Sequence, residues 1–307
     1  MRRFLLVACL AVTLLPSASR PQGANSPQGQ APAAGIDPTV LAKAKAGDAT
    51  SEWLLGKAYF DGDGVLKDYP QAAFWTQKAA NQGEVRAQLL MGLLCDLGWG
   101  APKDEVQAVL WYRKAAVQGN DAAQLIIGNS YRWGLHGLPQ DDSQAAIWYR
   151  KAAEQGDAGA EGALGDLYAK GQGVPQDYKQ AAYWYLSAAE QGDADAESGL
   201  GWLFESGEGV PKDWTQAVLW YRKAAAQNDQ GAQFNLGEMY QTGVGVPQDY
   251  GEAYFWLDIA AANNGSLPRE GALKARDEAA THLTPDVLLQ IQERARKWFE
   301  GHPANPQ

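Results

Sequence analysis

Residues 165–192, GDLYAKGQGVPQDYKQAAYWYLSAAEQG, predict a helix, a turn containing glycine and proline, and a second helix. Close copies recur along most of the chain, and alignment on one tryptophan gives steps of 36, 37, 36, 36 and 36 residues. A fixed period of this length is typical of a solenoid of stacked units. We therefore expect an all-α fold built from six helix–turn–helix repeats. The aligned tryptophans are Trp75, Trp111, Trp148, Trp184, Trp220 and Trp256.

Both predicted helices of the unit carry their apolar residues on one face. Ala160 and Leu164 are spaced by four residues in the first helix, and Ala181 and Trp184 by three in the second. Gly165 lies within the first helix, where glycine costs about 1 kcal/mol relative to alanine. Its recurrence in every copy predicts that the two helices approach closely there. We expect the tryptophan to fill the space beside the glycine and to belong to the core.

The turn between the helices contains two glycines, Gly171 and Gly173, which can adopt the positive φ that ends a helix. Asp177 is the expected N-cap of the second helix, and Gln180 can complete a capping box. The one extra residue of the third copy falls in its turn, near His136, so both helices stay in register. The equivalent cap pairs are Asp68/Gln71, Asp104/Gln107, Asp141/Gln144, Asp213/Gln216 and Asp249/Glu252.

The segments that flank the repeats have different compositions. Residues 1–19 combine a basic start with a short apolar run, which is typical of a signal peptide and predicts export to the periplasm or the medium. A lipobox ending at Cys9 is the alternative. Residues 20–36 are rich in Pro, Gln and Ala and predict a disordered leader, and residues 301–307 predict a disordered tail. Residues 40–46 resemble the end of a second helix and predict an N-terminal cap.

We assign residues 37–264 to the solenoid and residues 265–300 to a C-terminal helical cap with helices near 269–281 and 285–299. The Thr284-Pro285-Asp286 sequence is a strong helix start. The predicted repeats are 48–83, 84–119, 120–156, 157–192, 193–228 and 229–264.

Composition and motifs argue against several classes of function. Without Arg2 and Arg3 of the expected signal peptide, the chain has 24 basic and 36 acidic residues, a net charge of about −12, which argues against nucleic acid as a partner. The three histidines are scattered, without metal-ligand spacing, and most of the acidic residues are expected to be helix caps or to lie on solvated faces. Cys95 replaces an aromatic residue of the other repeats and is expected to be buried and inert. We predict no catalytic residue, no metal site and no cofactor.

The repeated pattern LGxxYxxGxGVPxDxxxAxxWYxxAAxQG resembles the Sel-one-like repeat (SLR) family, a relative of the tetratricopeptide repeat. The match extends over about residues 48–264 and occurs six times. The resemblance implies a right-handed superhelix of antiparallel helix pairs that scaffolds protein complexes. Exported bacterial members are linked with envelope regulation, exopolysaccharide secretion and interaction with host cells. A cysteine-rich branch is associated with weak β-lactamase activity, but this chain lacks the disulfide-linked helix pairs of that branch.

In such solenoids the first helices line the concave face, so positions there that vary between repeats are candidates for binding a partner. Apolar candidates predominate in the N-terminal half and acidic ones later. Trp202 is the most interesting candidate, because it does not occupy the position of the six aligned tryptophans. Its side chain is expected either to bind a partner or, with equal weight, to pack against a neighbouring helix. The candidate residues are Trp53, Lys57, Leu89, Leu93, Asn129, Arg132, Asp166, Trp202, Glu205, Phe234 and Glu238.

These patterns lead to one preferred function and two alternatives. The preferred hypothesis is an exported, non-catalytic adaptor that binds a protein or peptide in the groove of its repeats. The first alternative is a protein that binds cell-wall glycan or peptidoglycan, for which exposed tryptophan is suitable. The second is a β-lactamase-like hydrolase, as implied by the resemblance to the cysteine-rich branch.

Overall fold

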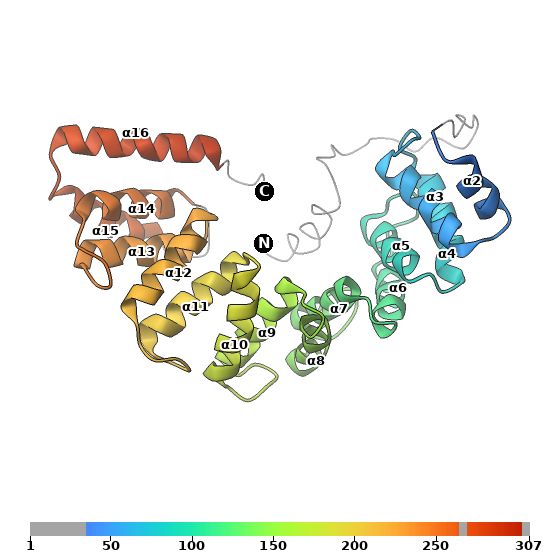
Figure 1. Ribbon diagram of the computed structural model, residues 1–307, viewed down its shortest axis with the longest axis horizontal. Coiled ribbons are helices and arrows are strands. Elements are labelled where there is room, and N and C mark those ends of the chain that lie inside the picture. The colour runs from blue at the N-terminus through green and yellow to red at the C-terminus, as the bar shows by residue number, and fades with distance from the viewer. Residues whose placement is uncertain (1–34, 264–268, 303–307) are drawn as a thin grey trace. The chain divides into compact units, whose positions relative to one another are not determined.

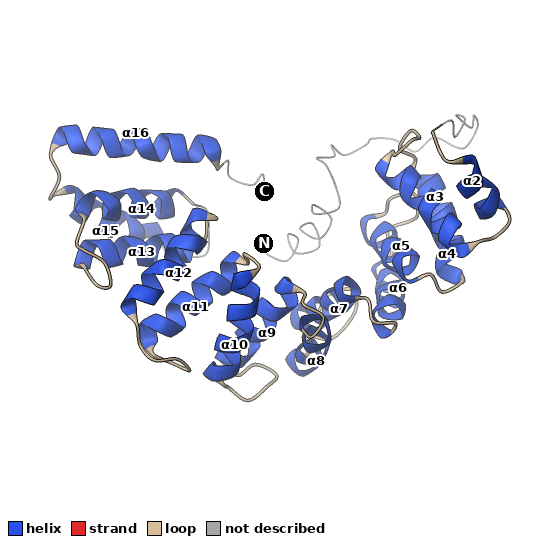
Figure 2. Cartoon of the chain, in the orientation of Figure 1, coloured by secondary structure: helices blue, strands red, loops and turns tan. Residues whose placement is uncertain are grey.

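The computed structural model describes residues 35–263 and 269–302, which form helices and connecting turns without a strand (Figures 1 and 2). The expected signal peptide (1–19), nearly all of the expected leader (20–36) and residues 303–307 of the expected tail lie outside these ranges. No helix among the described residues is both long enough and apolar enough to cross a membrane.

The chain divides into two compact units, Met1–Asp157 and Ala158–Gln307. The helices of the first unit are α2 (Pro38–Lys45), α3 (Ala49–Asp61), α4 (Tyr69–Asn81), α5 (Val85–Leu97), α6 (Glu105–Val117), α7 (Asp121–Trp133) and α8 (Asp142–Ala153). Those of the second unit are α9 (Ala158–Lys170), α10 (Tyr178–Glu190), α11 (Ala194–Ser206), α12 (Trp214–Ala226), α13 (Gln230–Thr242), α14 (Tyr250–Ala262), α15 (Arg269–Ala280) and α16 (Pro285–Gly301).

Helices pack in sequence order within each unit. Each first helix pairs with the second helix that follows it, as α3 does with α4 and α9 with α10 (Figure 1). Each second helix then contacts the first helix of the next pair in its unit, as α4 does with α5 and α10 with α11. The helix α2 packs on α3, and both α15 and α16 pack on α14. The prediction of an all-α solenoid closed by helices is therefore confirmed.

In four of the six repeats a tyrosine lies against the recurring glycine, and in the first and last repeats Thr76 and Leu257 take its place. The expectation that the tryptophan fills this space is therefore wrong, although Trp111 and Trp256 do belong to the buried core. A Cβ atom added to Gly201 would lie 2.7 Å from Cδ1 of Tyr221, whose side chain is fully buried. The preceding Trp220 is only partly buried. One residue of an α-helix turns the side chain by about 100°, so the two adjacent rings cannot both point at the glycine. The tyrosines at this position are Tyr112, Tyr149, Tyr185 and Tyr221.

Three of the six repeats bury a glutamate in the first helix, and these residues are exceptions to the expectation that most acidic residues are caps or lie on solvated faces. Glu197 is buried, and Gln227 at the end of α12 donates a hydrogen bond of 2.8 Å from Nε2 to its Oε2. Burial raises the pKa of Glu197. The side-chain amide at the end of the second helix satisfies the buried oxygen in each repeat. The equivalent buried position is occupied by glutamate in three repeats and by glutamine in the other three: Glu52, Gln88, Gln124, Glu161, Glu197 and Gln233.

The turns have the predicted backbone conformation, with φ values of +63° at Gly171 and +69° at Gly173. Asp177 caps α10, and its carboxylate accepts from the backbone N–H of Gln180 at 3.1 Å. The second half of the expected capping box is replaced, because the backbone N–H of Asp177 donates to the carbonyl of Tyr168 at 3.0 Å. That bond ties the start of each second helix to the end of its first helix.

Candidate interaction surfaces

Two neighbouring first helices of the second unit, α11 and α13, carry a tryptophan and two glutamates from the predicted set. Trp202 on α11 is 41% exposed, and its ring centroid lies 5.8 Å from that of Tyr178 at a tilted angle. Glu238 on the neighbouring α13 is exposed. Its pKa is raised by partial burial and by the charge of Glu205 on α11. We call Trp202, Glu205 and Glu238 the first-helix surface.

Three of the predicted polar residues hold the buried tyrosines in place. Tyr185 donates a hydrogen bond from its hydroxyl to Asp166 at 2.7 Å, and Tyr221 donates to Glu205 at 2.6 Å. In the first unit, the buried Asn129 accepts from Tyr149 at 2.7 Å. Each bond joins the second helix of a repeat to its first helix. These residues therefore have a structural role, whether or not Asp166 and Glu205 also contact a partner.

The other predicted residues of the first unit are tied to neighbours within it. The guanidinium of Arg86 lies 3.8 Å from the ring centroid of Trp53, and Arg132 pairs with Asp142 at 2.9 Å. Lys57 is exposed and pairs with Asp61 on the same helix. Leu89 and Leu93 are partly buried against the core of the first unit, and Phe234 is partly buried in the second.

The structure assembles a buried serine, histidine and aspartate that the sequence had not linked. Nδ1 of His136 lies 2.8 Å from Oγ of Ser130, and its Nε2 lies 3.4 Å from Asp96. Ser130 is fully buried, and its hydroxyl donates to the carbonyl of Ile126 at 2.7 Å. The hydroxyl proton is therefore already committed, and a substrate carbonyl cannot approach the oxygen in this conformation. His136 lies in the turn that contains the extra residue, has a φ of +55° and is buried.

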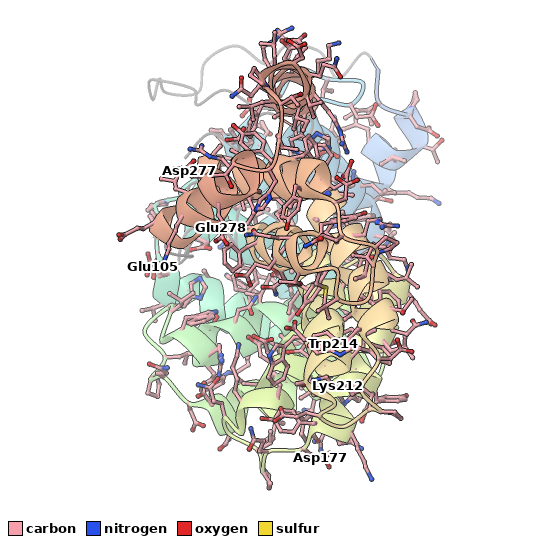
Figure 3. All side chains as sticks on the ribbon, turned by 90° about the vertical axis from the view of Figure 1, so that its left-hand side faces the viewer. Glu105, Asp177, Lys212, Trp214, Asp277 and Glu278 are labelled. Carbon is pink, nitrogen blue, oxygen red and sulfur yellow. The ribbon has the colours of Figure 1, made fainter. Side chains whose placement is uncertain are left out.

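The second helices expose a large apolar side chain at the position before the repeated tryptophan. In the first unit these residues are Phe74, Leu110 and Ile147. A lysine three residues after the tryptophan lies over its ring, with Nζ of Lys114 3.9 Å from the centroid of Trp111. Lysine and tryptophan also meet at the start of α12, where Nζ of Lys212 lies 4.1 Å from the ring of Trp214 (Figure 3). This surface was missed, although its apolar residues recur with the period of the repeat.

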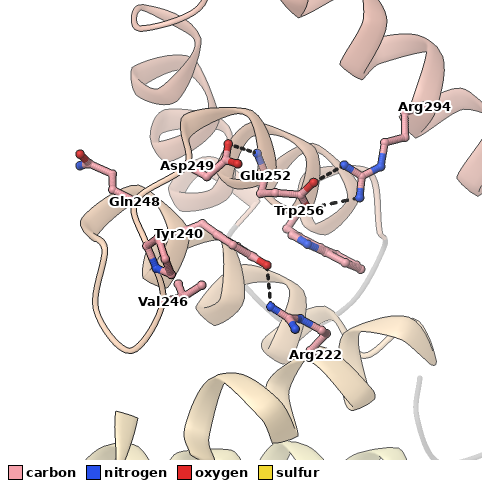
Figure 4. A pocket seen from close by; sticks show the side chains of 9 residues that line it. Arg222, Tyr240, Val246, Gln248, Asp249, Glu252, Trp256 and Arg294 are labelled. Carbon is pink, nitrogen blue, oxygen red and sulfur yellow. Dashed lines mark hydrogen bonds and ion pairs between the residues drawn. The ribbon is translucent and has the colours of Figure 1, made fainter. Parts of the chain in front are cut away.

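A pocket of about 530 Å³ opens in the second unit between the turn before α14, α12 and α16 (Figure 4). Arg222 donates to the hydroxyl of Tyr240 at 2.7 Å, and Arg294 forms an ion pair with Glu252. Both guanidinium groups thus already have partners within the protein. Among residues 35–263 and 269–302 no group of three or more acidic, histidine or cysteine side chains is arranged to hold a metal ion.

The pKa of Asp193, the N-cap of α11, is raised from 3.8 to about 6, mainly by burial and further by the nearby charges of Asp195 and Glu197. The folded state therefore holds a proton that the unfolded chain releases between about pH 4 and 6, and this group costs stability as the pH rises. Asp193→Asn keeps the acceptor for the Ala196 N–H, which lies 2.8 Å from Oδ1, and removes the charge.

We expect Asp193→Asn to be more stable than the wild type by about 1–3 kcal/mol at pH 7.5 and to lose this advantage at pH 4.5. Thermal unfolding at both pH values measures the difference. Asp229→Asn is the matched control, because Asp229 caps α13, which has no acidic residue in its first turn. An equal gain at both pH values would show that the charge of Asp193 is not the cause.

Comparison with protein families gives a match to the Sel1 repeat at residues 49–84, 85–120, 121–157, 158–193, 194–229 and 231–265. Among solved structures, the chain is similar to a Sel1 repeat protein from Oxalobacter formigenes, with 35% identity, a TM-score of 0.62, and coverage of 70% of this chain and 88% of that one. It is also similar to a protective antigen of uropathogenic Escherichia coli with an SLR fold, at 30% identity, a TM-score of 0.37, and coverage of 85% and 70%. A comparison with curated proteins gave no match.

Proposed function

The chain belongs to the Sel1 repeat family, whose members generally mediate protein–protein interaction, and on this premise we propose that it is an exported, non-catalytic adaptor. The observation that carries the proposal is the first-helix surface, where the exposed Trp202 lies one turn from Glu205 on α11 and the charge of Glu205 acts on Glu238 of the neighbouring α13. Tryptophan is enriched among the residues that dominate binding energy at protein interfaces. The proposed partner is a protein or peptide segment that presents an apolar side chain next to a lysine or arginine.

The carboxylates define the charge expected of the partner. Glu238 is partly desolvated and repelled by Glu205, which raises its pKa, so a cation placed between them would relieve the repulsion. A basic group is also attracted over longer distances by the net charge of −10. Electrostatic complementarity of this kind favours a partner with a basic segment over an acidic one.

Two further features support the proposal. The serine of the Ser130–His136–Asp96 group is fully buried, which favours a structural role for that group over hydrolysis. Export is proposed from the basic start and short apolar run of residues 1–19. The proposed location is the periplasm or the medium.

The test begins with affinity capture from an envelope extract of the source organism, using the chain from residue 20 onward, with mass spectrometry to identify retained proteins. The affinity of each captured protein is then measured for the wild type and for Trp202→Ala and Glu238→Gln. We expect Trp202→Ala to weaken binding by about 30-fold, as loss of a central aromatic contact costs about 2 kcal/mol or more, and Glu238→Gln by a smaller factor.

Tyr183→Ala is the matched control, because Tyr183 is a 63% exposed aromatic residue of the same unit on a second helix. Its affinity should equal that of the wild type. If Trp202→Ala and Glu238→Gln bind every captured protein as tightly as the wild type, the first-helix surface is not the binding site. Co-sedimentation with purified sacculi, lost in Trp202→Ala, would instead support glycan binding.

A further inference from the structure

One position of the second helices is exposed in the first five repeats and covered in the last. Leu110 on α6 is 46% exposed and Ile147 on α8 is 49% exposed. Their equivalent on α14 is Phe255, which is 2% exposed. All three precede the repeated tryptophan, so they occupy the same site on the helix. The difference therefore comes from what packs on the helix.

The helix α16 covers Phe255. The ring of Trp298 meets Phe255 edge to face with centroids 6.1 Å apart, and the guanidinium of Arg294 lies 3.8 Å from the centroid of Phe255. Gln292 adds a hydrogen bond of 3.2 Å to the hydroxyl of Tyr254. Figure 1 shows α16 lying alongside α14 at the end of the second unit. The outer face of a second helix can thus bind an amphipathic helix, and this chain contains one example.

Charge matches α16 to α14. The helix α14 carries Glu252 and Asp258 and no lysine or arginine, whereas α16 carries Arg294, which pairs with Glu252. Asp258 pairs with Arg276 of α15 at 3.0 Å. The acidic groups on α14 therefore form ion pairs with basic groups on the helices that cover it.

The sign of the charge is reversed on α6 and α8. The position of Asp258 is taken by Arg113 and Arg150, each followed by a lysine, and the position of Glu252 is taken by glutamine. Arg113 donates to the hydroxyl of Tyr131 at 3.0 Å, and Nζ of Lys151 lies 4.2 Å from the ring centroid of Trp148. In the part of the chain that the structure describes, no carboxylate lies within ion-pair distance of Arg113, Lys114 or Lys151. Two basic, apolar second helices of the first unit therefore lie exposed on a chain that is acidic as a whole, and α12 of the second unit repeats the pattern with Leu219, Arg222 and Lys223.

We propose that α6 and α8 form a second binding surface, the outer surface, which takes an acidic amphipathic helix of a partner protein. Its apolar side packs on Leu110 and Ile147, and its carboxylates pair with Arg113, Lys114 and Lys151. The packing of α16 on Phe255 indicates that the partner segment is an amphipathic helix. The basic groups on α6 and α8, where α14 has acidic ones, indicate that this helix is acidic. This surface lies on second helices and is independent of the first-helix surface.

Two synthetic peptides test the proposal against the full chain. Both have the sequence of residues 285–301, one unchanged and one with Arg294, Arg296 and Lys297 replaced by glutamate. Fluorescence anisotropy measures their binding at low ionic strength. We expect the acidic peptide to bind at least 10-fold more tightly than the unchanged peptide. Leu110→Ala combined with Ile147→Ala, and Arg113→Glu combined with Lys114→Glu, should each weaken the acidic peptide at least 10-fold.

The control variant is Tyr183→Ala on α10, where the exposed residue stands at the same position but Leu186 and Ser187 replace the two cations. It should bind the acidic peptide like the wild type. Unchanged affinity in both double variants, with far-UV circular dichroism like the wild type, overturns the proposal. So does absence of peptide binding together with binding to phosphatidylglycerol vesicles that depends on Leu110 and Arg113, which would assign the surface to an anionic membrane.

Discussion

Tyr221→Ala is expected to lower the free energy of unfolding by about 3–5 kcal/mol, because it removes a fully buried ring and leaves a cavity. The ring lies directly against Gly201, where a Cβ atom would be 2.7 Å from Cδ1. Because Gly201 has no side chain, nothing on that helix can fill the space that the ring leaves. The substitution also removes the hydrogen bond from the hydroxyl to Glu205 at 2.6 Å. Urea unfolding followed by circular dichroism measures the change.

Two controls separate the causes of this loss. Tyr221→Phe keeps the ring and removes only the hydroxyl, so it should cost about 1–3 kcal/mol through the hydrogen bond to a charged acceptor. Tyr183→Ala removes the same type of side chain from the exposed side of α10 and should change stability by less than about 0.5 kcal/mol. If Tyr221→Ala were no more destabilising than Tyr221→Phe, packing of the ring against Gly201 would not be the main contribution.

Gly209→Ala is expected to cost about 3 kcal/mol or more, although it adds a single methyl group. Gly209 has φ of +72°, which costs a non-glycine residue about 1–2 kcal/mol. Its Cβ atom would also lie 2.3 Å from the carbonyl oxygen of Tyr178, at the first turn of α10 in the preceding repeat. Backbone cannot rotate away as a side chain can, so the turn before α12 would have to shift away from α10.

Gly192→Ala isolates the conformational part of that cost. Gly192 has φ of +87°, but a Cβ atom there meets no neighbour within 4 Å. It should therefore cost only about 1–2 kcal/mol. Thermal and urea unfolding of the two variants under the same conditions measure the difference. Equal losses would mean that the close approach of Gly209 to α10 relaxes without cost.

The helices themselves were predictable from the sequence, because the signals that start and end them are local. Asp177 caps α10 through groups only a few residues away, and the glycines of each turn need only a positive φ. The period of the tryptophans then aligned all six pairs. The two C-terminal helices were predicted for the same reason, since Thr284 and Pro285 mark the start of α16.

The sequence alone did not show which candidate residues on the first helices serve packing and which are free to bind a partner. Asn129 and Trp202 occupy the same position of the repeat, yet Asn129 is buried beneath Tyr149 and Trp202 is exposed. A variable position in a repeat can serve packing or binding, and the pattern of residues alone does not distinguish them. Whether any of these residues contacts a partner stays a prediction.

The sequence by itself determined the all-α class, the helix pairs and their turns, because helix periodicity, caps and glycine φ values depend on residues within one repeat. Only the tertiary structure decided that Tyr221 rather than Trp220 lies against the glycine, that Glu197 is buried, and that Ser130, His136 and Asp96 meet. It also decided that Phe255 is covered while Leu110 and Ile147 are exposed. Burial and contact of this kind depend on neighbouring helices, and the same residue pattern acquires a different environment where a different helix packs on it.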